Sequence, residues 1–487
     1  MNPSKRTCLL MVSIFLLSRF MYWKLGIRFY GETITWYFQY LDVPLLKHDL
    51  LISCYFLHSQ PPLFNIFLGI ILQLFPLSSQ YAFHACFLLC GFILYWSIFS
   101  ILTRIVSLKI ALIASTCFII SPQIIIYENW LFYSYPVCTL LILVVHSLIQ
   151  LIITAKMRYA FFFFSLIGCI CLIRSSFHLI YYVGCVLFIY YIFPKKRAIV
   201  MYAAVPIMII VLCVYAKNAF LFGEFGTSSW MGMNLWKIAR ICISEKELEQ
   251  LKLNENLPTF ISLKSPFQES TTIYPKEFWA IPSRFQHVAA LTDDVKTSGA
   301  NNFNYYGYLH INRGYMKASL CVIKKYPLRY LSGILSAWLH YLKPSAEYPH
   351  LNSNIEKIAM LVKWRRWLYD HTTISLHFLY RSSLDVNNKF SQTSLISLVV
   401  LLGILAGGIW FVAVTQNKNN KHIILFCLLT IFYIAIITNL FDFGENSRFR
   451  FETNPLYFII FCVLLEKVCI KIKALTYSFK QGSDTAI

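Results

Sequence analysis

The sequence predicts an all-α polytopic membrane protein with about ten transmembrane helices, a membrane-hugging first outer loop, and one long outer loop between the seventh and eighth helices. Two observations support this fold class. Of the 487 residues, 58% are apolar and only 13% are charged, whereas a soluble globular protein is usually about a quarter charged. The apolar residues also form long runs that recur along the chain, separated by short basic clusters.

The net charge of +21 does not indicate a nucleic-acid partner. Most of the basic clusters lie in gaps between apolar runs, where lysine and arginine set the orientation of membrane helices. We therefore expect the lipid bilayer, and no nucleic acid, to be the partner of these residues.

The first apolar run, TCLLMVSIFLLSRFMYW, predicts a retained helix rather than a cleaved signal peptide. A signal peptide needs small residues at a cleavage site after its apolar core, and here Arg19 and bulky side chains stand there instead. Lys5 and Arg6 precede the run and place its start in the cytoplasm.

Nine further apolar runs predict helices long enough to cross a membrane, several near the lower limit of about 17 residues. They span residues 80–102, 109–125, 137–154, 159–173, 178–193, 198–216, 393–415, 423–440 and 455–470. The run 62–76 lies between prolines and is shorter, so we expect it to be a re-entrant or surface-lying helix.

The distribution of basic residues indicates that residues 62–76 do not cross the membrane. If this run does not cross, the later basic clusters lie on the cytoplasmic side with Lys5 and Arg6: 104–109, 156–158, 195–197, 418–422 and 467–473. If it crosses, the first four of these clusters lie outside, against the positive-inside rule.

The same topology divides the chain into four parts. They are an N-terminal transmembrane module (1–217, with the first outer loop at 25–79), a long extracytoplasmic loop with amphipathic helices (218–392), a C-terminal three-helix segment (393–473) and a cytoplasmic tail (474–487). The polar segments then share the non-cytoplasmic face: 32–65, 127–136, 174–178, 218–392 and 441–452. We expect one water-accessible site on that face.

Acids on this face are candidates for a general base. A carboxylate among apolar groups at a membrane surface is partly desolvated, so its pKa rises toward the range where it takes a proton from a hydroxyl. Glu32, Asp42 and Asp49 in the first outer loop are the first candidates, and Glu128 approaches from the second loop. The alternative for each is a solvated loop charge or a helix cap.

Basic and aromatic residues on the same face are candidates for substrate binding. Arginine holds phosphate in a bidentate fashion, and flat aromatic rings stack on sugars, although headgroup contact or an aromatic belt also explains such residues. The candidates are His58, Gln60, Asn129, Trp130, Arg174, Arg448 and Arg450. An acid, arginines and aromatic rings at a bilayer surface fit transfer from a lipid-linked phosphate donor.

The sequence contains no Gly-rich phosphate loop, GxSxG, HExxH or paired-cysteine metal motif. This absence counts against nucleotide hydrolases, serine hydrolases and zinc enzymes. No residue is assigned as a metal ligand.

Several segments resemble the GT-C class of polyprenyl-phosphate-sugar glycosyltransferases, in particular the bacterial relatives of protein O-mannosyltransferases. An acid after the first helix, followed by HSQPPLFNIFLGIILQLFP, resembles the first loop of that class. YENWLFYSYP, LIRSSFHLIYY, FGEFGTSSWMGMNL and GENSRFRFETNPL resemble its later segments. The resemblance extends over most of the chain.

The resemblance implies that residues 1–217 are the catalytic module. It implies inverting transfer of a sugar from a polyprenyl-phosphate donor to an extracytoplasmic acceptor, which is a protein, lipid or glycan. Some members of the class use a divalent metal ion, and no other cofactor is implied. Gly31-Glu32-Thr33 departs from the adjacent Asp-Glu pair common in the class, so Glu32 is the positional match and Asp42 stays an alternative base.

Two other functions stay open from the sequence. One is a polymerase or ligase acting on polyprenyl-linked glycan, and the other is a non-catalytic lipid-glycan transporter. A transporter more commonly shows similar halves and polar groups at mid-membrane, and neither is evident. The chain has no Asn-x-Ser/Thr sequon, which favours a bacterial inner membrane over the endoplasmic reticulum.

Overall fold

Helices make up 75% of the structure, a computed structural model that describes residues 4–375 and 392–484. Part of the predicted long outer loop (376–391) and the end of the predicted tail (485–487) lie outside the described residues. The first half of the chain forms helices α1 Lys5–Lys24, α2 Thr33–Trp36, α3 Val43–His48, α4 Leu50–Tyr55, α5 Leu63–Leu74, α6 Ser79–Leu102, α7 Leu108–Ile119, α8 Pro122–Glu128, α9 Ser134–Thr154, α10 Met157–Ile173, α11 Leu179–Ile192 and α12 Arg197–Phe222.

The second half is also mainly helical and contains one short antiparallel hairpin. Its helices are α13 Met231–Ala239, α14 Glu245–Asn254, α15 Ala289–Thr292, α16 Gly307–Lys325, α17 Pro327–Leu342, α18 Asn352–Ile355, α19 Ala359–His371, α20 Leu395–Val414, α21 Lys418–Phe441 and α22 Asn446–Asp484. The hairpin pairs β1 Thr373–Ser375 with β2 Gln392–Ser394.

The prediction of an all-α membrane protein is confirmed. Within the described residues, six helices are long and apolar enough to cross a bilayer, or seven if α7 and α8 count as one bent span. The six are α1, α6, α9, α20, α21 and the helix Pro194–Phe222 that contains α12. Helices also form at the other predicted positions, but α10 and α11 have only 17 and 14 residues, near or below the usual length of a span.

The predicted helix over residues 109–125 is interrupted. α7 ends at Ile119 and α8 begins at Pro122, with a bend of 55° between them. Proline has no N–H for the helix ladder and disfavours helical backbone in the residue before it. Ser121 accordingly takes an extended conformation with ψ 140°.

Residues 62–76 form α5, a helix of 12 residues that starts directly after Pro62. At about 1.5 Å per residue, such a helix is shorter than the hydrocarbon core of a bilayer, which is about 30 Å thick. α5 packs against α3, α4 and α6, so the first outer loop is a set of short helices that pack on the bundle.

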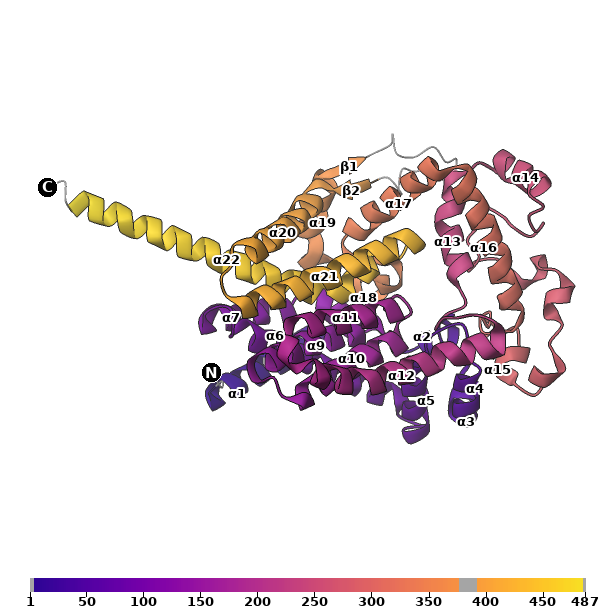
Figure 1. The fold of residues 1–487 in the computed structure, drawn as a ribbon, viewed down its shortest axis with the longest axis horizontal. Helices are drawn as coiled ribbons and strands as arrows, with labels where there is room; N and C mark the ends of the chain where they lie inside the picture. The colour runs from indigo at the N-terminus through magenta and orange to yellow at the C-terminus, as the bar shows by residue number, and fades with distance from the viewer. Residues whose placement is uncertain (1–3, 376–391, 485–487) are drawn as a thin grey trace.

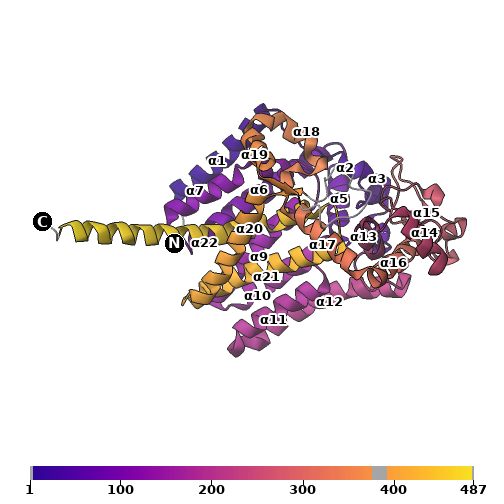
Figure 2. The same ribbon diagram turned by 90° about the horizontal axis from the view of Figure 1, so that it is seen from above.

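The molecule has two layers, visible in Figure 1 and again from above in Figure 2. The apolar bundle comprises α6, α7, α9 to α12 and α20 to α22, and α13, α14 and α16 lie together at one end of it. This end layer has its own core, centred on Trp230, Trp236 and Tyr315. α17 connects the layers because it contacts α13 and α16 as well as α21 and α22.

Candidate functional site

A cavity of about 490 Å³ lies where the apolar bundle meets the end layer. Its lining includes six charged side chains, three cations and three carboxylates: Arg174, Lys237, Arg448, Glu224, Asp442 and Glu445. They come from the residue after α10, from α13, from the segment after α12, from the turn between α21 and α22, and from the first turn of α22. We call this space the charged cavity.

The turn between α21 and α22 positions both central carboxylates. Asp442 follows the last residue of α21, and Glu445 precedes the first residue of α22. Gly444 between them has φ +102°, a conformation that favours glycine. The side chain of Asn446 fixes the turn because its Oδ1 accepts from the Gly444 N–H at 2.9 Å and its Nδ2 donates to the Asp442 carbonyl at 3.0 Å.

Arg174 and Arg448 both lie against the same aromatic ring. Their guanidinium carbons lie 4.5 and 5.0 Å from the centre of the Phe449 ring. Each has a carboxylate partner: Arg174 pairs with Glu452 at 3.3 Å, and Arg448 pairs with Glu445. The cavity therefore presents two nearly buried guanidinium groups that are held in fixed positions.

Asp442 and Glu445 have different environments. The Lys237 ammonium lies 2.5 Å from Asp442 Oδ1. Glu445 accepts hydrogen bonds from Arg448 and, at 2.9 Å, from the Tyr348 hydroxyl.

These environments move the two carboxyl pKa values in opposite directions. Burial raises the pKa of Asp442, and the attraction of Lys237 only partly offsets it. Burial also acts to raise the pKa of Glu445, but Arg448 and then Lys237 lower it by more, so its pKa lies below the ordinary value. A pair of acids with separated pKa values is typical of a site in which one acid exchanges a proton and the other stays ionised.

Three of the predicted binding residues line the charged cavity: Gln60, Arg174 and Arg448. Arg450 does not line it. Residues two apart on a helix point to different faces, so Arg448 faces the cavity while Arg450 donates to the carbonyls of Tyr341 and Lys343, both at 2.9 Å.

The expected meeting of Glu32 and Asp42 with Arg448 is not seen, because neither acid is part of the cavity lining. Glu32 is exposed at the start of α2. Asp42 caps α3 by accepting from the Val43 N–H at 2.8 Å, and its Oδ2 accepts from the Thr297 N–H at 2.7 Å. Asp42 thus ties the first outer loop to the long loop.

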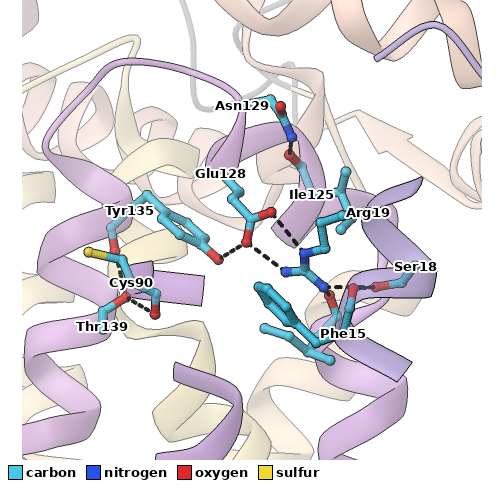
Figure 3. A network of polar contacts seen from close by, with 10 residues as sticks. Phe15, Ser18, Arg19, Cys90, Ile125, Glu128, Asn129, Tyr135 and Thr139 are labelled. Atoms are coloured by element: carbon cyan, nitrogen blue, oxygen red, sulfur yellow. Dashed lines mark hydrogen bonds and ion pairs between the residues drawn. The ribbon is translucent and has the colours of Figure 1, made fainter. Parts of the chain in front are cut away.

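Glu128 is fully buried inside the bundle, and Figure 3 shows it in an ion pair with Arg19 of α1. Arg19 donates from Nε and Nη2 at 2.9 and 2.6 Å, and the Tyr135 hydroxyl donates at 2.8 Å. A buried carboxylate with this set of donors has a structural role, because it supplies the counter-charge of a buried arginine. It does not face the charged cavity.

The other predicted residues support the walls of the site. Burial lowers the pKa of the His58 imidazole to about 3, and Nδ1 lies 2.7 Å from the Ser229 hydroxyl. His58 is therefore neutral near pH 7 and is no cation for phosphate. Trp130 stacks on Phe132, on which Arg448 rests, and the Asn129 carbonyl accepts from the Tyr30 N–H at 2.8 Å.

The charged cavity does not fit a divalent metal ion. Its two central carboxylates are already in ion pairs with Lys237 and Arg448, which neutralise the charge that a metal needs. In the described parts of the chain, no group of three or more His, Cys, Asp or Glu side chains is placed to hold a metal.

Asp442, Glu445 and Lys237 were missed as site residues from the sequence. The segment 441–452 is recognisable as polar and outward-facing, and Glu445 with Arg448 has the spacing of a helical ion pair. Lys237 carries no such signal because it lies 205 positions before Asp442 in the chain.

Fold and site together define a helical membrane protein with a cavity of paired charges at one end of its bundle. Comparison of the chain with protein-family models, curated proteins and solved structures finds no match.

Proposed function

We propose that the protein is a membrane glycosyltransferase that moves a sugar from a polyprenyl-phosphate donor to an extracytoplasmic hydroxyl acceptor, with inversion. The observation that supports this most is the charged cavity, in which two buried arginines and two carboxylates with separated pKa values share aromatic walls. The resemblance of the polar segments to the GT-C class points to the same reaction.

Arg174 and Arg448 would bind the donor phosphate. Both are buried and oriented by aromatic rings, so little side-chain freedom is lost when an anion binds. A guanidinium close to the bridging oxygen stabilises the charge that develops as the phosphate leaves. Tyr133, Phe38 and Trp230 in the cavity wall offer rings for the sugar and the first part of the lipid.

Asp442 is the general base in this proposal. The acceptor oxygen attacks the anomeric carbon, its proton passes to the Asp442 carboxylate, and the bond between the sugar and the phosphate oxygen breaks. The carboxylate loses one negative charge as the leaving phosphate gains one, so the net charge of the cavity is conserved. Glu445 stays ionised and holds Arg448.

The proposed topology has ten crossings, with α10, α11 and the apolar part of α22 as the spans beyond the seven above. The chain termini lie toward one end of the bundle, and α13, α14 and α16 lie at the other (Figure 1). This arrangement fits a charged cavity on the non-cytoplasmic face. A bacterial inner membrane is favoured, and the endoplasmic reticulum is the alternative.

Incubation of the purified protein with labelled polyprenyl-phosphate sugars and lipid, peptide and glycan acceptors tests the proposal. The wild type should form a new glycosidic bond, and Asp442→Asn should lower turnover by about 10²–10⁴-fold because the base is lost. Glu249→Gln on the exposed surface of α14 is the matched control and should keep full turnover.

Glu32→Gln and Asp42→Asn belong in the same assay, because the resemblance names them as alternative bases. Selective loss of activity in either variant, with Asp442→Asn active, would move the base to the first outer loop. Movement of labelled lipid across vesicles without a new bond would replace the transferase with a transporter, and elongation of a lipid-linked glycan would indicate a polymerase.

A further inference from the structure

A second cavity of about 550 Å³ lies between α19, α20, the start of α22 and the bend between α7 and α8. We call it the lateral cavity. One part of its wall is apolar and includes Ile124, Leu401, Ile404 and Phe458. Among the described residues, none lines both this cavity and the charged cavity.

The polar part of the lateral cavity is basic. Among the described residues, its lining includes Arg365 and Arg450 but no aspartate or glutamate. Of Arg450, only 7% is exposed, and its Nε has no hydrogen-bond partner. Its Nη1 and Nη2 donate only to backbone carbonyls among the described contacts.

Arg450 differs in this respect from the other buried arginines of the bundle. Arg19, Arg174 and Arg448 each have a carboxylate within 4.0 Å, whereas within the described residues no such pair is formed by Arg450. A buried cation without a counter-charge is costly. An anion from outside the chain would supply the missing charge.

The elements around the lateral cavity have the character of a membrane interface. α19 exposes Trp364 and Trp367 beside basic residues, which is typical of a helix in the headgroup region. In α20, which is apolar throughout, the buried residues are Gly408 and Phe411, so most of the helix is at least partly exposed. α18, which precedes α19, is tied to the segment after α1 because Asn354 Oδ1 accepts from the Arg28 N–H at 3.2 Å.

We propose that the lateral cavity binds an anionic phospholipid, with the phosphate on Arg365 and Arg450 and an acyl chain along the apolar wall of α20 and α22. Arginine forks match phosphate oxygens, and the apolar wall suits a hydrocarbon chain. This binding goes beyond the proposed transfer reaction and does not depend on it, because it uses a separate cavity.

The test uses the full-length protein in neutral detergent, titrated with dioleoylphosphatidylglycerol, with dioleoylphosphatidylcholine or with inorganic phosphate, and bound lipid is counted by native mass spectrometry. The anionic lipid should bind saturably to the wild type. Arg365→Gln should weaken its binding about tenfold, the effect of losing one charge-assisted contact. Lys363→Gln removes an equal charge from an exposed position of the same helix and should bind as the wild type does.

Arg450→Gln should weaken binding similarly, and a second variant, Leu401→Trp, fills the apolar wall without changing charge and should do the same. Equal binding of the two phospholipids, or equal loss in Arg365→Gln and Lys363→Gln, would overturn the proposal. Saturable binding of inorganic phosphate with the same affinity as the anionic lipid would overturn the role of the acyl chain.

Discussion

Asp442 and Glu445 are three positions apart, yet their carboxyl groups differ because different cations meet them. Lys237 from the end layer meets Asp442, and Arg448 from the same helical turn holds Glu445. Desolvation therefore dominates the pKa of Asp442, whereas attraction to cations dominates that of Glu445. The assignment of Asp442 as the base depends on this difference.

The pH dependence of transfer should reveal the role of Lys237. Lys237 lowers the pKa of Asp442, so Lys237→Gln should raise it further. Because a base must be deprotonated, activity is lost as the pH falls through this pKa. The acidic limb of the rate profile should therefore move to higher pH, by roughly one unit. Transfer rates measured across the acidic and neutral range give this shift.

Lys252→Gln is the matched control for Lys237→Gln. Lys252 pairs with Glu249 at 2.9 Å on α14, away from the cavity, so its loss should leave the acidic limb in place. An acidic limb that is the same in Lys237→Gln and in the wild type would remove Asp442 from the role of base.

Part of the site could be predicted from single residues. Arg174 and Arg448 were identified because they lie on the outer face and suit phosphate. The role of Glu128 could not be predicted, because its partner Arg19 lies in the first helix, 109 positions away. The role of Asp42 also depends on a distant residue. Its carboxylate accepts from the Thr297 N–H and so links the first outer loop to the long loop.

At the scale of elements, Glu128 fits into a notch that α6 leaves at Gly91. A Cβ atom at Gly91 would lie 2.0 Å from Glu128 Oε2 and 2.8 Å from the Tyr135 hydroxyl. The absence of a side chain there allows α6, α8 and α9 to meet around the Arg19 and Glu128 ion pair. This packing holds α1 against the bundle (Figure 3).

Gly91→Ala should therefore destabilise the bundle, by about 1–3 kcal/mol, because the added methyl group displaces a buried ion pair. Gly184→Ala in α11 is the control, since a Cβ there meets no atom within 4 Å. Thermal unfolding in detergent should show a lower midpoint for Gly91→Ala and an unchanged or higher midpoint for Gly184→Ala. Equal midpoints for the two variants would show that the notch has no role in packing.

Helix positions were well predicted because apolar runs in a membrane protein have few alternatives to helix. Breaks within a run and the face that each helix buries depend on single residues and on tertiary contacts. Pro122 interrupts the run 109–125. In α17, the large apolar side chains of Leu331 and Leu335 are exposed, while the small residues Gly333 and Ala337 are buried. Hydrophobicity alone cannot distinguish a lipid-facing surface from a buried one in such a helix.

At the scale of the whole molecule, the charged cavity exists only because two layers meet. Arg174, Asp442 and Arg448 belong to the apolar bundle, and Lys237 belongs to the end layer. The sequence indicated that polar segments share one face, but it could not show which of them meet, since those contacts join residues far apart in the chain. The structure brings segments 174–178 and 441–452 together and places Glu32 and Asp42 elsewhere.

The most direct test of the central claim is an experimental structure of the protein in a lipid nanodisc with a non-hydrolysable polyprenyl-phosphate sugar analogue. The account predicts density for the phosphate between Arg174 and Arg448, with the sugar beside Asp442. Phosphate density beside Glu32 in the first outer loop, or at Arg365 and Arg450 in the lateral cavity with the charged cavity empty, would contradict it.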